Sequence, residues 1–309
     1  MCIRDSIRKS ALSRLGFDHK TFVKYNDKII TAFAVGFSSD GPYRDLPAYD
    51  DIIQAASGMA SYQEAYSDQP SYTSGATADK ATGLMLALSV VSSLFKRNKD
   101  NKDLEVEVPM FETMVDFTLV EHLYGYNFLP PKDEPVYPRQ SSPNRKPYET
   151  KDGFIAVLPY NDEQWLRFLK FIKKEHLIKT KKFSTLENRN KNVDELYSLL
   201  VKELKKEKTN FWIKKLREID IPSMKINKPK DLFIDEHLKK TKFFKTYKHS
   251  TECDLMYPQL PVYFNNERAN ESKFEAPNLG NKTKEILIDL GYDKNEIENL
   301  RKEKVIFFE

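Results

Sequence analysis

One stretch of the sequence, Ser74 to Leu88, places a single carboxylate, Asp79, at the start of an apolar helix. After Asp79, apolar residues recur at spacings of three and four, which is typical of a helix with one buried face. These positions are Ala81, Leu84, Met85, Leu88, Val91 and Phe95. The pattern therefore predicts a helix that begins beside Asp79 and buries this face.

Asp79 has two interpretations. As the residue before the helix, it can be an N-cap whose carboxylate accepts from the free backbone N–H groups of the first turn. The position also suits a nucleophile, because the positive end of the helix dipole keeps a carboxylate ionised and can stabilise an oxyanion beside it. The residues alone leave both interpretations open, and the N-cap is the more ordinary of the two.

Other segments carry equally readable patterns. Residues 28–37 are apolar and β-branched and residues 104–108 alternate, so both predict strands. Helices are predicted over 7–16, 49–58, 111–128, 163–171, 193–204, 210–217 and 283–290. Trp165 and Trp212 fit helical stripes, which makes them core residues rather than ligand platforms.

Two segments suggest boundaries. Residues 130–147 contain six prolines and few apolar residues, which predicts a linker between domains. Residues 1–6 connect to no pattern downstream, so we treat them as a suspected non-native scar and exclude them from the fold.

The composition of the chain argues against several classes of function but points to none. The 309 residues carry a formal net charge of only +4, with basic and acidic residues interleaved, so nucleic-acid binding is not expected. Cys2 and Cys253 are too few for a disulfide framework or a metal site, and we expect a reducing, cytoplasmic location. The longest apolar run, residues 85–95, is shorter than a membrane span, so no membrane partner is expected. Phosphate-binding glycine loops, a glycine-flanked serine and spaced histidine ligands do not occur in the sequence.

A series of short motifs runs through the chain in a fixed order. They are Arg8…Leu15-Gly16, Gly36-Phe37…Gly41-Pro42-Tyr43, Tyr49-Asp50…Gln54-Ala55…Ser57-Gly58, Ala78-Asp79…Thr82-Gly83, Tyr148…Gly153, Ile221-Pro222 and Pro277…Tyr292. In this order they resemble the class III coenzyme A transferases, a family that includes formyl-CoA and carnitine CoA-transferases and the alpha-methylacyl-CoA racemases. The resemblance runs from about Ile7 to the C-terminus.

The resemblance implies roles for two residues. Asp79 matches the aspartate that attacks an acyl-CoA thioester, giving a covalent aspartyl intermediate through which coenzyme A moves to a second carboxylic acid. Arg8 matches an arginine that contacts the CoA phosphates, although Arg8-Lys9-Ser10 stands here in place of the family's Arg-Pro-Gly. Acyl-CoA is then a substrate, with no permanently bound cofactor and no metal.

The resemblance also implies a fold and an assembly. The fold class is α/β, with a partial Rossmann-like large domain over residues 7–129 and a smaller α+β domain over residues 148–240. Residues 241–309 are expected to return to the large domain. Full-length members of the family form interlocked homodimers. The motifs of the family's N-terminal part do not occur, so we expect this chain to lack that part and to bind CoA poorly alone.

Two alternatives remain. Racemases or epimerases of the family have a histidine where this chain has Tyr49, and a tyrosine with an ordinary pKa of about 10 is a poor base at neutral pH, which favours transfer. A non-catalytic fragment that needs a partner chain is the other alternative. Tyr49 and Asp50 are interpreted only as neighbours of the site.

Overall fold

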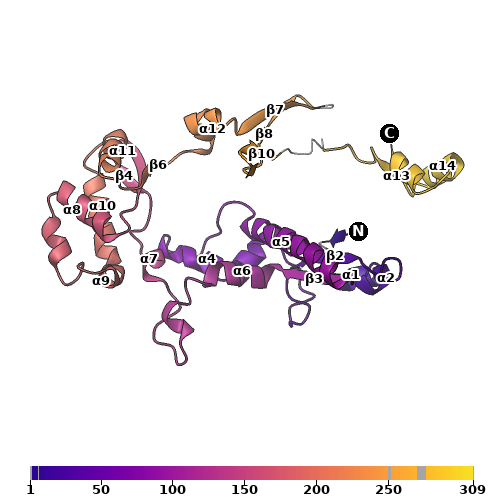
Figure 1. Ribbon diagram of the computed structural model, residues 1–309, viewed down its shortest axis with the longest axis horizontal. Helices are drawn as coiled ribbons and strands as arrows, with labels where there is room; N and C mark the ends of the chain where they lie inside the picture. Colours follow the sequence, from indigo (N-terminus) through magenta and orange to yellow (C-terminus); the bar gives the residue numbers. More distant parts are fainter. Residues whose placement is uncertain (1, 6, 250–251, 270–275, 309) are drawn as a thin grey trace. The chain divides into compact units, whose positions relative to one another are not determined.

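The computed structural model describes residues 2–5, 7–249, 252–269 and 276–308 (Figure 1). The fold is mixed α/β, and the chain divides into two compact units, Met1–Ile226 and Asn227–Glu309. The sequence instead predicts boundaries at residues 130–147 and 240, and the two domains and returning C-terminal segment expected there stay predictions.

The first unit begins with a parallel sheet of three strands in the order β1-β2-β3. The strands are β1 (Cys2–Asp5), β2 (Ile30–Val35) and β3 (Leu104–Pro109). The central strand β2 is almost wholly buried, which explains its uninterrupted apolar sequence. The expectation that residues 1–6 lie outside the fold is wrong for Cys2–Asp5, because these residues pair with β2. A larger Rossmann-like sheet stays a prediction.

Helices make the crossovers that parallel strands require. Between β1 and β2 lie α1 (Lys9–Arg14) and α2 (His19–Val23). Between β2 and β3 lie α3 (Asp50–Ala56), α4 (Met59–Tyr62), the 3₁₀ helix η1 (Gln63–Ala65) and α5 (Thr77–Asp100). The long helix α5 packs on both β2 and β3 (Figure 1).

Helix α5 confirms the predicted helix but turns a different face inward. Its buried residues are Ala78, Thr82, Leu86 and Ser93. The predicted buried positions include Leu84, Leu88 and Phe95, which are 74%, 62% and 75% exposed. The prediction is wrong because the face of α5 that packs on the sheet carries Leu86 and Val90, which lie against Ala32 and Val108. The predicted stripe lies outside this contact and stays uncovered.

The same helix has the length and apolar composition of a membrane span, and 22% of its most apolar window is buried. The helix extends beyond residues 85–95 at both ends, so its most apolar window is longer than the run read from the sequence. Length and composition are the only criteria met, and core helices of soluble proteins also meet them. Absence of a membrane partner and a cytoplasmic location stay predictions.

The rest of the first unit begins with α6 (Met110–Leu119), η2 (Tyr124–Asn127) and α7 (Pro138–Ser141). An antiparallel sheet follows in the order β4 (Tyr148–Thr150), β5 (Gly153–Val157) and β6 (Ser223–Lys225). Its helices are α8 (Asp162–Phe171), η3 (Glu175–Lys179), α9 (Leu186–Lys191), α10 (Val193–Leu204) and α11 (Thr209–Glu218). Trp165 and Trp212 lie in the apolar core that these elements share, as predicted.

Part of the predicted linker is packed structure. Helix α7 contacts α10, and the Ser142 hydroxyl donates a hydrogen bond of 2.7 Å to Asp194. The prolines of residues 130–147 therefore shape an ordered connection rather than a bare spacer.

The second unit consists of short elements. They are η4 (Pro229–Ile234), α12 (Glu236–Lys240), β7 (Phe244–Lys248), β8 (Asp254–Pro258), β9 (Tyr263–Phe264), β10 (Glu267–Arg268), α13 (Thr283–Asp289) and α14 (Lys294–Lys302). Strands β7 and β8 pair antiparallel, as do β9 and β10. The return of residues 241–309 to the large domain stays a prediction.

Candidate functional site

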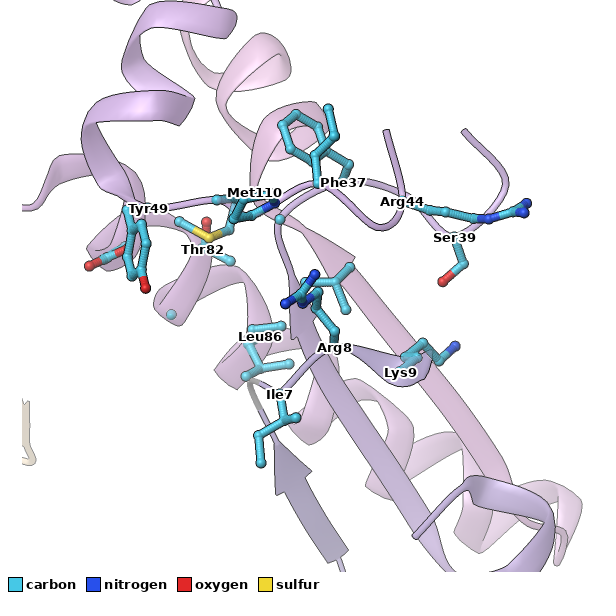
Figure 2. A pocket seen from close by; sticks show the side chains of 18 of the residues that line it. Ile7, Arg8, Lys9, Phe37, Ser39, Arg44, Tyr49, Thr82, Leu86 and Met110 are labelled. Carbon is cyan, nitrogen blue, oxygen red and sulfur yellow. The ribbon is translucent and has the colours of Figure 1, made fainter. Parts of the chain in front are cut away.

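A cavity of about 1440 Å³ opens at the carboxyl ends of the parallel strands (Figure 2). Both residues singled out from the sequence, Arg8 and Asp79, line it. Figure 2 shows Phe37, Leu86 and Met110 in the same wall, from the segment after β2, from α5 and from the start of α6. The structure thus brings together residues that lie far apart in the sequence.

Gly36 allows two walls of this cavity to meet. A Cβ atom on Gly36 would lie 2.3 Å from the Cβ of Ala48, which is far inside van der Waals contact. Glycine therefore lets the chain just after β2 pass against the segment that leads into α3. This approach brings Tyr49 and Asp50 close to the start of α5.

Asp79 is the third residue of α5 and not its N-cap. The N-cap is Ala76, whose side chain makes no capping hydrogen bond, so the predicted capping role is wrong. The Asp79 side chain is exposed to the cavity, and its carboxylate accepts no hydrogen bond from the described residues. The carboxylate of Asp79 therefore lies in the first turn of a 24-residue helix and is accessible from the cavity.

Asp50 supplies the cap that Asp79 does not. It is the first residue of α3, and its Oδ1 accepts a hydrogen bond of 3.0 Å from the backbone N–H of Asp79. From the sequence Asp50 is only a neighbour, because nothing in the spacing of 29 residues indicates this contact. Tyr49 lines the cavity and is 77% exposed.

Lys9 also lines the cavity, and its ammonium group is paired with two carboxylates. Lys9 Nζ lies 2.5 Å from Glu105 and 2.9 Å from Glu107. The Glu107 carboxylate also accepts from the Ser39 backbone N–H at 2.8 Å and from the Ser39 hydroxyl. This cluster ties α1, β3 and the turn after β2 together.

The same cluster shifts two pKa values. Burial acts to raise the pKa of Glu107, but the Ser39 hydroxyl, the Ser39 N–H and Lys9 outweigh burial and hold that pKa below its usual range. Burial acts to lower the pKa of Lys9, and hydrogen bonds and charge from Glu105 and Glu107 raise it overall.

Arg8 is an exposed cation in the cavity lining. Its Nη1 donates to the backbone oxygen of Asp45 at 2.9 Å, and the side chain remains exposed along the cavity. Arg44 also lines the cavity, with its Nε 3.5 Å from the Asp45 carboxylate. Across residues 2–5, 7–249, 252–269 and 276–308, no three His, Cys, Asp or Glu side chains form a group able to hold a metal ion.

The family model and the curated relatives that match this chain are all described as CoA-transferases. A model of the family described as CoA-transferase family III matches residues 3–283. The (R)-2-hydroxy-4-methylpentanoate CoA-transferase of Clostridioides difficile is 27% identical over 97% of this chain and 75% of its own length. The cinnamoyl-CoA:phenyllactate CoA-transferase of Clostridium sporogenes is also 27% identical, over 97% of this chain and 74% of its own. The crystal structure of Rv3272 from Mycobacterium tuberculosis superposes with a TM-score of 0.73 at 18% identity, covering 88% of this chain and 72% of that one.

The cluster at Glu107 predicts a pH-dependent stability. A lowered carboxyl pKa contributes stability that is present above the unfolded pKa, about 4.3, and is lost as the pH falls through the folded value. Glu107→Gln should therefore lower the free energy of unfolding at pH 7 by about 1 kcal/mol. Lys9 stays charged throughout this range, so it adds no pH dependence.

Urea unfolding at pH 7 and at successively lower pH measures the difference. We expect the gap between the native chain and Glu107→Gln to narrow as the pH falls below the unfolded pKa of about 4.3 and to close below the lower folded pKa. Glu175→Gln, which changes an exposed carboxylate on η3, is the matched control and should show no such gap. A gap for Glu107→Gln that is the same at every pH would contradict the assignment.

Proposed function

The chain belongs to CoA-transferase family III, and on that premise we propose that it moves coenzyme A from an acyl-CoA thioester to a carboxylic acid through Asp79. The observation that supports Asp79 is its place in the first turn of α5, with a carboxylate that no described residue engages and that faces the cavity. Acyl-CoA is a substrate in this proposal and not a resident cofactor.

The proposed reaction balances without an added base. An Asp79 oxygen attacks the thioester carbonyl, the C–S bond breaks, and a mixed anhydride and the CoA thiolate result. The thiolate attacks the Asp79 carbonyl, releasing the donor acid as its carboxylate and leaving an aspartyl-CoA thioester. The acceptor carboxylate attacks this thioester, and the freed thiolate then takes the acceptor acyl group from the second anhydride. Asp79 is regenerated as a carboxylate.

Racemisation is less well supported by the cavity. It requires one group that removes the α-proton and another that returns a proton on the opposite face. The described lining residues include Asp79 and Tyr49 but no histidine that could serve as the second proton-transfer group. Exchange of solvent deuterium into the acyl α-carbon, at a rate equal to or above that of transfer, would favour the racemase alternative.

Asp79→Asn tests the covalent step. The amide keeps the size of the side chain and removes the nucleophile, so CoA transfer should fall by about 10³-fold or more. Intact-mass measurement after incubation with (R)-2-hydroxy-4-methylpentanoyl-CoA or cinnamoyl-CoA should show an adduct on the native chain and none on the variant. Asp51→Asn, an exposed carboxylate in α3 outside the cavity lining, is the matched control and should keep the adduct. An adduct that survives Asp79→Asn defeats the proposal.

We propose that Arg8 contacts the phosphates of CoA. Its exposed guanidinium lines the cavity, and guanidinium geometry suits phosphate oxygens. Arg8→Gln should raise the KM for acyl-CoA about tenfold with little change in kcat. Acyl-pantetheine, which lacks the nucleotide phosphates, should be used equally by the native chain and the variant. Arg14→Gln, at the C-terminal end of the helix α1 that follows Arg8 and outside the cavity lining, serves as the control. Equal losses with both substrates would exclude a phosphate role.

We also propose that the chain forms a homodimer, and the exposed stripe of α5 supports this. Leu84, Leu88 and Phe95 present a row of large apolar side chains to water, which is typical of an interaction surface. Sedimentation velocity should report a dimer for the native chain. Leu88→Glu should weaken dimerisation at least about 100-fold, because it places a charge in an apolar contact. Lys214→Glu, an exposed position on α11, should leave the dimer intact. A native chain that sediments as a monomer at high concentration would refute this.

A further inference from the structure

We infer that Asp50, Gln54 and Thr73 form a hydrogen-bonded relay that fixes the start of α5 and thereby positions Asp79. The inference rests on the proposed role of Asp79 as nucleophile for its catalytic consequence, but the relay itself is a structural claim. Asp50 does not touch the reacting atoms in this proposal, so it is a positioning residue and not a catalytic one.

Both oxygens of the Asp50 carboxylate are engaged. Oδ1 accepts from the backbone N–H of Asp79 at 3.0 Å, and Oδ2 accepts from Gln54 Nε2 at 2.6 Å, one helical turn further along α3. A carboxylate held through both oxygens by different elements cannot rotate without losing a bond. Its orientation therefore fixes the position of the Asp79 amide.

Gln54 carries the relay into the segment before α5. The residue is fully buried, at 0% exposure, and its Oε1 accepts from the Thr73 backbone N–H at 2.9 Å and from the Thr73 hydroxyl at 3.1 Å. A backbone N–H can only donate, so the amide atom that faces it must be oxygen, and the NH₂ group must face Asp50. The direction of every bond in the relay is thus determined.

The relay makes up for the missing cap of α5. Ala76 offers no side-chain oxygen, whereas Asp50 reaches the helix from α3 and satisfies one of its free N–H groups. The Thr73 hydroxyl also lies 3.1 Å from the hydroxyl of Thr77, the first residue of α5. Both oxygens of Asp50 therefore accept hydrogen bonds, whereas the Asp79 carboxylate accepts none from the described residues.

Position matters at this site because misplacing a reacting group by about 1 Å can cost about 10²-fold in rate. The Asp79 side chain is exposed and accepts no bond from the described residues that would orient it. Its placement must come from its backbone, and the bond from its own N–H to Asp50 is the nearest fixed point.

The direction of the bonds allows a compensating pair of substitutions. Asp50→Asn places an NH₂ group against the NH₂ of Gln54, because the remaining oxygen is needed by the Asp79 N–H. Gln54→Glu places two carboxylates against each other. The double variant Asp50→Asn/Gln54→Glu restores every donor and acceptor, since the new amide at position 50 donates to the new carboxylate at position 54.

Hydrogen exchange of residues 77–80 tests the relay without reference to activity. We expect protection in the native chain, exchange at least about tenfold faster in each single variant, and protection regained in the double variant. Thr73→Val, which removes only the hydroxyl, should give a smaller acceleration. Unchanged exchange in both single variants would overturn the relay.

The rate of adduct formation with cinnamoyl-CoA tests the consequence for Asp79. Each single variant should slow it about 10- to 100-fold with the KM changed less than about twofold, and the double variant should recover to within about fivefold of native. A folded double variant that regains protection but stays as slow as the singles would show that the charge of Asp50, and not its geometry, acts on the site. Failure of Asp79→Asn to abolish the adduct would refute the proposed function while leaving the exchange result intact.

Discussion

The cavity depends on the parallel pairing of β2 with strands on both sides. Parallel strands end at the same edge of a sheet, so the segments after β1, β2 and β3 all emerge there. Arg8 follows β1, Phe37 follows β2 and Met110 follows β3, and all three line the cavity. Helix α5 leads directly toward the start of β3, so it runs opposite to the strands and its N-terminus reaches the same edge. Asp79 is placed at the cavity by this topology, whatever its chemistry.

The acidic side chains near this edge of the sheet, Glu107, Asp50 and Asp79, differ in their contacts. Glu107 pairs with Lys9 and accepts a hydrogen bond from the Ser39 N–H, so it connects β3 with α1 and with the turn after β2. Asp50 accepts hydrogen bonds from the Asp79 backbone N–H and from Gln54, and so connects α3 with the start of α5. The Asp79 carboxylate, by contrast, lines the cavity and accepts no hydrogen bond from the described residues.

Sequence patterns predicted most elements of this region but not how they meet. The apolar run of β2 and the periodicity of α5 are local signals, and both elements were found where these signals indicated. Periodicity reports that a helix has an apolar stripe but not which neighbour covers it. For α5 the contact with the strands is made by Leu86 and Val90, which do not belong to the predicted stripe.

The contacts that build the site were beyond those patterns. The Gly36–Ala48 approach and the bond from Asp79 to Asp50 join residues whose separation along the chain says nothing about distance in space. Asp79 and Arg8 were paired only by resemblance to a family, because neither residue type nor spacing links them. The sequence also did not predict Ala76 as the N-cap of α5, because Asp79, three residues later, is a residue type that commonly caps helices.

The composition of the buried face of α5 explains why polar bonds matter so much at its start. Of its four buried residues, Leu86 is the one large apolar side chain, and Ala78, Thr82 and Ser93 contribute little apolar area. Apolar burial is also non-directional, so it holds a helix against a sheet without fixing its rotation or its sliding along the axis. Hydrogen bonds are directional, and those from Asp50 and Thr73 act within the first turn, where Asp79 lies. Polar bonds therefore add direction to the packing of Ala78 against Ile53 and Met114 at the start of α5, beside the proposed nucleophile.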